Sequence, residues 1–159
     1  MPSNSEAAEQ LRFLVLAAQR EGQRIFAAAL RPLGVTPTQA EALRVLADHE
    51  PLLLRELGAL LVSETGSPSR LVSAMVQLGW VERSAAADRR AVELRLSHDG
   101  HRVADAVTQA EHALYEQINT GIRGRDLAAT MDLLSAFIAG RPTDLALKRR
   151  RARQLAQGT

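Results

Sequence analysis

Apolar residues in the first part of the chain recur at helical spacing. Leu11, Leu14 and Val15 belong to a stripe that continues along residues 6–31, where apolar side chains stand three and four positions apart. This spacing predicts one long amphipathic helix. The helix is expected to end at residues 32–34, a Pro-Leu-Gly sequence that a helix does not readily continue through.

A second helix is predicted to begin near residues 36–38, and the sequence allows two starting points. In the first, Thr36 precedes the helix and Pro37 takes the first helical position. In the second, Thr38 caps the helix and Glu41, three residues later, completes a capping box. The apolar face of this helix comprises Ala40, Leu43, Leu46 and Ala47.

Two short helices are predicted next, joined by a polar turn that contains one glycine. Leucines recur at helical spacing within residues 53–61, and the turn covers residues 63–66. Ser67 and Pro68 then form a cap and a first helical position, and Gly79 marks the end of the helix. Such a pair of helices is typical of a helix-turn-helix motif. The second helix is expected to bury Leu71, Val72, Met75 and Leu78.

The hydrophobic period then changes from helical spacing to alternation. Residues 80–83 and 92–96 are predicted strands, with Val92, Leu94 and Leu96 directed inward. A loop of small residues followed by two arginines, residues 84–90, separates them. A β-hairpin after a helix-turn-helix motif forms the element known as a wing.

Two more helices follow the hairpin. Ser97 is the predicted cap of a helix that extends to about residue 120, and Asp126 begins another that ends at Gly140. The predicted fold is therefore mainly α with a small β-hairpin wing: a winged helix-turn-helix with a helical dimerisation region. The DNA-binding lobe is assigned to residues 35–97, and the dimerisation region to residues 6–34 and 98–140.

Charge is unevenly distributed along the chain. The net charge is +2, but residues 141–159 contain six basic residues and one acidic residue, so the remainder carries a net charge of −3. Any surface for nucleic acid must therefore be local. The basic tail, with one more short helix from Asp144 as an option, either contacts phosphates beside the main site or is a disordered, soluble end.

Composition excludes several classes of function. The chain has no cysteine, which removes disulfides, thiolate zinc sites and thiol-based redox sensing. It contains no glycine-rich phosphate loop and no nucleophile elbow, so we expect neither an enzyme nor a cofactor. His98 and His101 stand three residues apart, but a zinc site needs three or four ligands, and we expect no metal.

Apolar stretches and the amino-terminal sequence bear on location. The apolar runs are shorter than the roughly 20 residues that span a bilayer, and the first residues do not resemble a secretory signal. A cytoplasmic protein without a membrane partner is expected. Long apolar stripes on the first helix and on the last two exceed what the small lobe can cover, which independently favours a homodimer.

The helix at residues 67–78 is the candidate for insertion into the major groove of double-stranded DNA. Its outward face carries small polar and basic side chains and no acid, which suits approach to bases and phosphates. An exposed face that only contacts solvent is the alternative. The candidate DNA-binding residues on this helix are Ser67, Ser69, Arg70 and Ser73.

The predicted wing supplies four further candidates. Arg83, Arg89 and Arg90 are cations on or near the hairpin, and an arginine at a hairpin tip can enter a narrow minor groove. Asp88 repels phosphate, so its role would be to orient a neighbouring arginine through a charge-assisted hydrogen bond. A solvated charge pair in a turn is the alternative for Asp88 and its neighbour.

Five short motifs accompany this order of elements. They are residues 36–40 (TPTQA), 69–72 (SRLV), 79–83 (GWVER), 88–92 (DRRAV) and 96–100 (LSHDG). In this combination the chain resembles the MarR family of bacterial transcription regulators over about residues 8–140. Trp80 and Leu78 depart from the family pattern, in which an aliphatic and a basic residue are usual.

The resemblance implies a homodimeric regulator, by default a repressor, on a pseudo-palindromic operator. Its two recognition helices would lie in successive major grooves about 34–36 Å apart. It also implies release by a small-molecule effector, often an anionic aromatic, bound between the dimerisation helices and the lobe. Arg20, Gln23 and Arg24 are candidates for holding an anion there, or for pairing with nearby acids.

A protein-interaction module is the alternative function. Winged helices also bind proteins, in which case the exposed face of residues 67–78 should be apolar. The serines and the arginine on that face favour DNA instead. Affinity that falls steeply with salt distinguishes the two.

Overall fold

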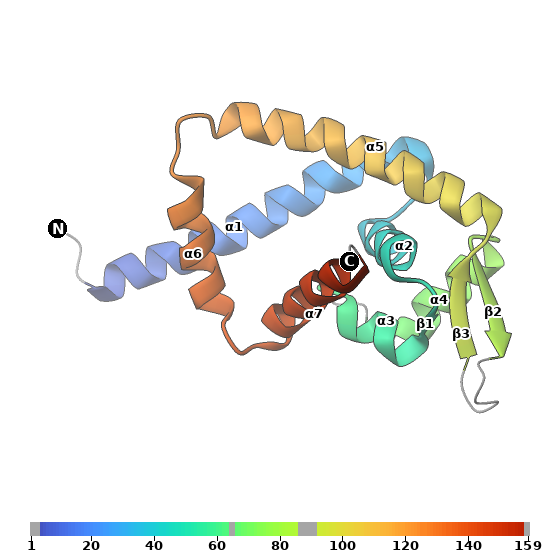
Figure 1. Ribbon diagram of the computed structural model, residues 1–159. Helices are drawn as coiled ribbons and strands as arrows, with labels where there is room; N and C mark the ends of the chain where they lie inside the picture. The colour runs from blue at the N-terminus through green and yellow to red at the C-terminus, as the bar shows by residue number, and fades with distance from the viewer. Residues whose placement is uncertain (1–3, 64–65, 86–91, 158–159) are drawn as a thin grey trace.

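A computed structural model of the chain describes residues 4–63, 66–85 and 92–157 (Figure 1). Its elements confirm the predicted class, mainly α with a small antiparallel sheet. In chain order they are α1 (Asn4–Leu30), the 3-10 turn η1 (Arg31–Leu33), α2 (Pro37–His49), β1 (Leu52–Leu53), α3 (Leu54–Leu60), α4 (Pro68–Gln77), β2 (Val81–Ala85), β3 (Val92–Leu96), α5 (His98–Gly121), α6 (Leu127–Ile138) and α7 (Pro142–Gln157).

The start of α2 uses the first of the two predicted caps. The hydroxyl of Thr36 accepts a hydrogen bond from the backbone N–H of Gln39 at 3.3 Å, and the Gln39 side chain accepts one from the Thr36 N–H at 2.9 Å. This reciprocal pair is a complete capping box. The alternative with Thr38 and Glu41 is wrong, because the Glu41 carboxylate binds backbone N–H groups after α3 instead.

The predicted caps of the later helices are confirmed. Ser67, Ser97 and Asp126 each accept a hydrogen bond from the backbone N–H three residues further on, at 3.4, 2.9 and 3.0 Å. At the other end of α4, Gly79 has a φ of 75°, a left-handed conformation that glycine adopts without steric strain.

The sheet has one strand more than the sequence predicts. Its order is β1-β3-β2, with antiparallel pairing throughout. β1 has only two residues, too few for an alternating pattern, and Leu52 of β1 pairs with Leu94 of β3. The core of the lobe lies between this sheet and helices α2, α3 and α4. Its fully buried large side chains include Leu43, Leu46, Leu52, Leu57, Val72, Met75 and Leu94.

Two residues predicted to be buried are half-exposed. Val92, at the hairpin end of β3, is 48% exposed, whereas Leu94 and Leu96 of the same strand are buried as predicted. Alternation correctly marks the face, but burial decreases along β3 towards its hairpin end. Leu78 is 50% exposed because the chain leaves α4 there, and Trp80 packs against the core.

Helices α1 and α5 extend away from the lobe, and the chain then returns through α6 to α7 (Figure 1). The basic tail is a helix that contacts α3 and α2, so its folded part is longer than the short helix considered from sequence. Along α6 the described residues include no buried side chain. Within the described ranges, no helix combines the length and apolarity needed to cross a membrane.

Candidate nucleic-acid interface

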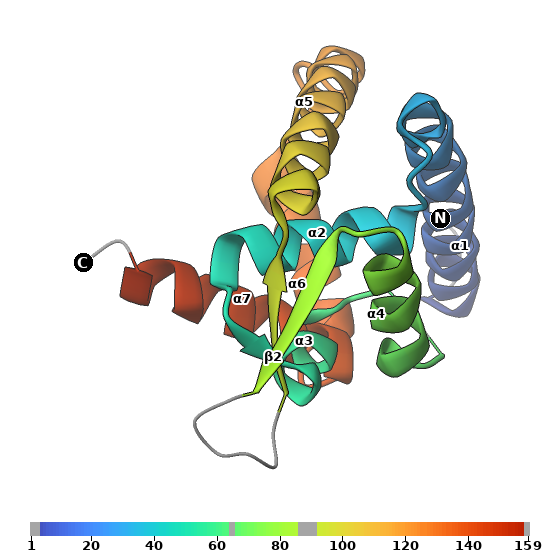
Figure 2. The same cartoon turned by 90° about the vertical axis from the view of Figure 1, so that its right-hand side faces the viewer.

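Helix α4 lies at the surface of the lobe beside the strands of the wing (Figure 2). Ser69 and Arg70 are exposed, and Ser67 and Ser73 are partly buried. The opposite face carries Val72 and Met75, which have no exposed surface. The candidate face is therefore accessible within the protomer, and none of its residues from Pro68 to Gln77 is acidic.

Close packing fixes the beginning of α4 against α3. A Cβ atom placed on Gly58 of α3 would lie 3.2 Å from Cγ of Pro68. The Ser67 cap then satisfies the N–H of Arg70. Because α3 approaches α4 this closely, a movement of α3 would displace the start of α4.

The structure brings together two of the predicted site residues from different elements. The guanidinium of Arg83, on β2, donates a hydrogen bond to the hydroxyl of Ser73, on α4, at 2.9 Å. Sequence reasoning assigned both residues to DNA contact and did not foresee this bond. The bond links the base of the wing to the helix beside it.

The other three wing candidates fall in a part of the chain outside the described residues. They are Asp88, Arg89 and Arg90. Their expected contact with the minor groove remains a prediction from sequence. Arg83 is the wing candidate whose surroundings the structure describes.

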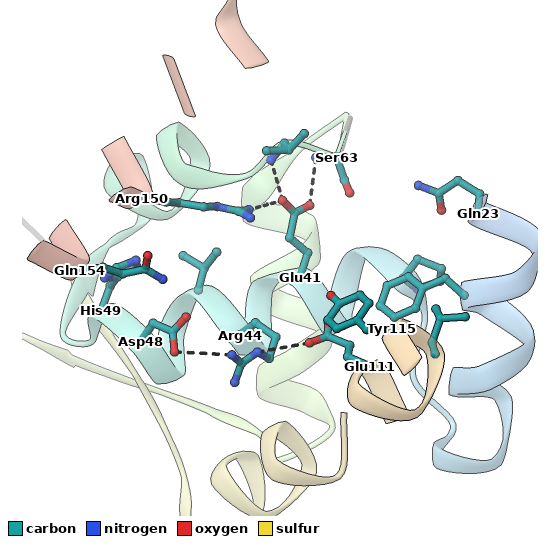
Figure 3. Close-up of a pocket in the computed structure, with 15 residues that line it drawn as sticks. Gln23, Glu41, Arg44, Asp48, His49, Ser63, Glu111, Tyr115, Arg150 and Gln154 are labelled. Carbon is teal, nitrogen blue, oxygen red and sulfur yellow. Dashed lines mark hydrogen bonds and ion pairs between the residues drawn. The ribbon is translucent and has the colours of Figure 1, made fainter. Parts of the chain in front are cut away.

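A cavity of about 450 Å³ lies between α1, α2, α5 and α7 (Figure 3). One of its lining residues is Arg44 of α2, whose Nε lies 3.4 Å from Glu111 Oε2 and whose Nη2 lies 3.8 Å from Asp48 Oδ1. Arg44 also donates a 2.7 Å hydrogen bond to the hydroxyl of Thr108. The cavity therefore contains a polar bridge between α2 of the lobe and α5.

Carboxylates outnumber guanidinium groups in the cavity wall. Its carboxylates belong to Glu41, Asp48 and Glu111, and its guanidiniums to Arg44 and Arg150. Glu41 pairs with Arg150, which leaves two carboxylates to share Arg44. Figure 3 shows the two sets side by side, with each arginine directed at its partners.

The pKa values of the two glutamates shift in opposite directions. Burial raises the pKa of Glu41, but hydrogen bonds from Ser63 and Val62, with the charge of Arg150, outweigh it and hold that pKa below its usual value. Burial raises the pKa of Glu111, and Arg44 does not fully offset it. Burial and the nearby Glu111 charge raise the pKa of Tyr115 as well.

Sequence reasoning found little of this cavity. Gln23 does line it, but Arg24 pairs with Glu21 on the surface of α1 at 2.5 Å. Arg44 and Asp48 are four residues apart on α2, which is the spacing of an ordinary surface ion pair. Their role in a cavity depends on α5 and α7, which only tertiary structure brings near.

The two histidines considered as metal ligands, His98 and His101, have different surroundings. His101 Nε2 lies 2.9 Å from Glu50 Oε1, at the junction between α5 and the end of α2. His98 is exposed. Among the residues that the structure describes, no three His, Cys, Asp or Glu side chains are grouped to hold a metal ion.

Comparison with known proteins identifies relatives of the lobe. Residues 33–91 match the model of the MarR family. The organic hydroperoxide resistance transcriptional regulator of Bacillus subtilis (strain 168) is 33% identical over 92 residues, which are 57% of this chain and 63% of the relative. The match thus spans less than two thirds of that relative's length.

Solved structures share the fold over most of the chain. A cysteine-to-serine variant of MarR from E. coli in complex with operator DNA has a TM-score of 0.73 and 22% identity, covering 87% of this chain and 99% of that one. A probable transcriptional regulator from Pseudomonas aeruginosa has a TM-score of 0.69 and 24% identity, covering 83% and 99%. The reduced form of E. coli MarR has a TM-score of 0.66 and 24% identity, covering 81% and 96%.

Proposed function

We propose that the chain is a member of the MarR family of winged helix-turn-helix regulators, and that it binds double-stranded DNA as a homodimer and represses transcription. The observation that carries this proposal is the exposed, acid-free face of α4 beside the arginine-bearing wing. A negatively charged duplex can approach such a face without electrostatic repulsion. A MarR variant from E. coli with the same fold has been solved with operator DNA.

Dimerisation is proposed from the apolar surface that a single protomer leaves exposed. The apolar side chains of α6 that are roughly half-exposed are Leu127, Met131, Leu133, Leu134 and Phe137. Contiguous apolar surface of this kind on a protein marks an interaction site. We assign residues 6–34 and 98–140 to the dimer interface region and residues 35–97 to DNA binding, so that two-fold symmetry presents two copies of α4.

A small-molecule effector is proposed for the cavity between the lobe and α5. Two carboxylates share one arginine there, so a neutral or cationic ligand fits better than the anionic aromatic that the family resemblance suggests. Thermal unfolding with benzyltrimethylammonium and with salicylate tests this. A stabilisation by salicylate alone, abolished by Arg44→Gln, would reverse the assignment of ligand charge.

Selection of bound duplexes from a random DNA pool is the direct test of the main proposal. We expect a two-fold symmetric consensus with half-sites about one helical turn apart. Arg70→Ala should weaken binding to that site by about 1–3 kcal/mol. Arg151→Ala is the matched control, because Arg151 is exposed on α7, outside residues 6–140, to which dimerisation and DNA binding are assigned.

The outcome also separates the alternative function. Failure to enrich any sequence, together with no loss of DNA affinity at higher salt, would favour a protein-interaction module. An enriched site that Arg70→Ala binds as tightly as the unaltered protein would show that α4 is not the reading helix.

A further inference from the structure

Helix α7 carries most of the basic residues of the carboxyl-terminal segment, and several of them contact α3. Near the end of α3, the Arg150 Nε donates to the carbonyl of Leu60 at 2.7 Å, and Arg149 donates to the carbonyl of Ala59 at 3.4 Å. The last carbonyls of a helix lack partners within the helix and carry partial negative charge. Guanidinium groups therefore satisfy and stabilise this end of α3.

The other end of α3 is held by the same helix. One carboxylate oxygen of Glu56 accepts the backbone N–H of Leu53 at 2.9 Å, which caps the start of α3. The second oxygen lies 3.1 Å from Nη2 of Arg153. Because Arg153 reaches the start of α3 and Arg150 reaches its end, the two helices run in opposite directions and α7 holds both ends.

Arg150 extends this contact to the segment that follows α3. Its Nη2 pairs with Glu41 of α2, whose carboxylate accepts the backbone N–H groups of Val62 and Ser63 at 2.7 and 2.9 Å. The Arg150 side chain is only 25% exposed. One guanidinium thus joins α7 to α2, to the end of α3 and, through Glu41, to the backbone that leads towards α4.

The start of α7 is itself anchored. Asp144 is 8% exposed and accepts hydrogen bonds from the Gly140 N–H and from Lys148, both at 2.8 Å. Ala146, two residues later, is buried. The part of α7 from Ala146 to Arg153 is therefore docked, whereas Gln154, Leu155 and Ala156 are exposed.

We propose that α7 is a clamp that presets the orientation of α3, with Arg150 and Arg153 as positioning residues for DNA binding rather than phosphate contacts. The effect reaches DNA through the close approach of Gly58 in α3 to Pro68 at the start of α4. This inference depends on the proposed DNA binding for its functional consequence, but not for the clamp itself.

The clamp is tested by Arg150→Ala and Arg153→Gln, with Arg151→Ala as the matched control. Arg151 is exposed on the same helix and makes no hydrogen bond to α2 or α3 among the described residues. We expect the first two variants to bind the selected DNA roughly 3- to 30-fold more weakly, as for residues that modulate coupling between sites. Arg151→Ala should bind unchanged, and Arg153→Lys should recover most of the loss at that position.

Salt dependence distinguishes positioning from direct contact. A clamp residue leaves the slope of log affinity against log salt unchanged, whereas loss of one phosphate contact lowers its magnitude by about 0.9. A reduced slope for Arg150→Ala or Arg153→Gln would therefore overturn the proposal in favour of a DNA-contacting tail.

Hydrogen exchange tests the clamp without DNA. The amides of Val62 and Ser63 should exchange faster in Arg150→Ala than in the Arg151→Ala control, and those of α3 should exchange faster in Arg153→Gln. Unchanged exchange at both places would overturn the proposal. If Arg150→Ala does not fold, Arg153→Gln at the rim provides the same readout. Absence of DNA binding by every variant, with faster exchange retained, would refute the proposed function and not the clamp.

Discussion

The lobe and α6 both carry apolar residues at helical spacing, but these residues lie in opposite environments. On α2, Ala40, Leu43 and Leu46 have no exposed surface, whereas on α6 Met131 is 52% exposed and Phe137 48%. Helix α2 is surrounded by strand β3 and by helices α1, α3, α5 and α7. Apolar spacing predicts a helix in both cases, but it predicts burial only where the same chain supplies the covering surface.

Helix α5 passes from the buried environment to the exposed one. Val103, Ala104 and Val107, in its first half, are buried against the lobe. The last buried residue is Leu114, after which Tyr115 and Ile118 are nearly half-exposed. A single amphipathic stripe thus begins in the core of the protomer and continues onto a surface that a second protomer would cover.

The largest expected effect comes from making the same leucine-to-alanine substitution in each of these two environments. Leu43→Ala removes a fully buried side chain from the lobe and should lower the free energy of unfolding by about 2–5 kcal/mol. Leu133→Ala on α6, where the leucine is half-exposed, should instead weaken association of protomers. Urea unfolding and sedimentation velocity measure the two quantities.

Association is the discriminating readout for this pair. For the folded protein, Leu43→Ala is expected to leave the monomer–dimer dissociation constant unchanged. Leu133→Ala is expected to raise that constant. If Leu133→Ala destabilised a monomeric protein as strongly as Leu43→Ala does, α6 would be packed within its own chain and the contrast would disappear.

Local rules were sufficient for most element boundaries. The capping residues Ser67, Ser97 and Asp126 are read directly from sequence because each acts within one helical turn. The same rules left two starts for α2 open, since Thr36 and Thr38 both satisfy them. Tertiary structure decides between these, because Glu41 is occupied by the N–H groups that follow α3.

Long-range contacts account for what the sequence did not predict. Strand β1 exists because Leu52 pairs with Leu94, more than forty residues away. The site residues on α4 were read from one helical face, but the bond between Arg83 and Ser73 needs the wing folded back beside α4. Docking of α7 could not be inferred from its charge, which suggested solvent or DNA rather than the ends of α3.

Glycine-to-alanine substitutions compare packed and open surroundings again, with the next largest expected change in stability. A Cβ on Gly100, at the start of α5, would lie 2.0 Å from the backbone oxygen of Trp80, which cannot move without shifting the wing. Gly100→Ala should therefore lower stability by about 1–3 kcal/mol or more. On α1, a Cβ placed on Gly22 would meet no neighbouring atom within 4 Å, so Gly22→Ala should stabilise by about 0.5–1 kcal/mol.

Thermal unfolding of the two glycine variants shows directly whether each substitution raises or lowers stability. Gly58→Ala is an informative intermediate, because its nearest neighbour at 3.2 Å is the side chain of Pro68 rather than backbone. A destabilising Gly22→Ala would mean that α1 is contacted along that face, and the helical region would then be more closely packed than its exposed side chains indicate.

The smallest expected effect concerns two glutamates that line the cavity, Glu41 from α2 and Glu111 from α5. Since hydrogen bonds hold the pKa of Glu41 below its ordinary value of 4.5, its carboxylate stabilises the fold above that pH. This stability is lost as the pH falls through 4.5 and then through the lower native pKa. Burial raises the pKa of Glu111, so its ionised form opposes folding at neutral pH, and the fold gains stability as the pH falls towards 4.5.

Replacing each glutamate by glutamine should therefore change stability in opposite senses at pH 7, on the order of 0.5–1 kcal/mol. Glu41→Gln lowers it, and the difference from the unaltered protein shrinks as the pH falls through 4.5 and then through the lower native pKa, where Glu41 itself becomes uncharged. Glu111→Gln raises it, since Arg44 keeps Asp48 and Thr108 as partners. Urea unfolding from pH 3 to pH 7, with Glu116→Gln on the exposed part of α5 as control, measures both. If both variants lost the same free energy of unfolding at pH 7, Arg44 would fully compensate the charge of Glu111. The α5 and lobe residues of the cavity would then not differ in how well their carboxylates are neutralised.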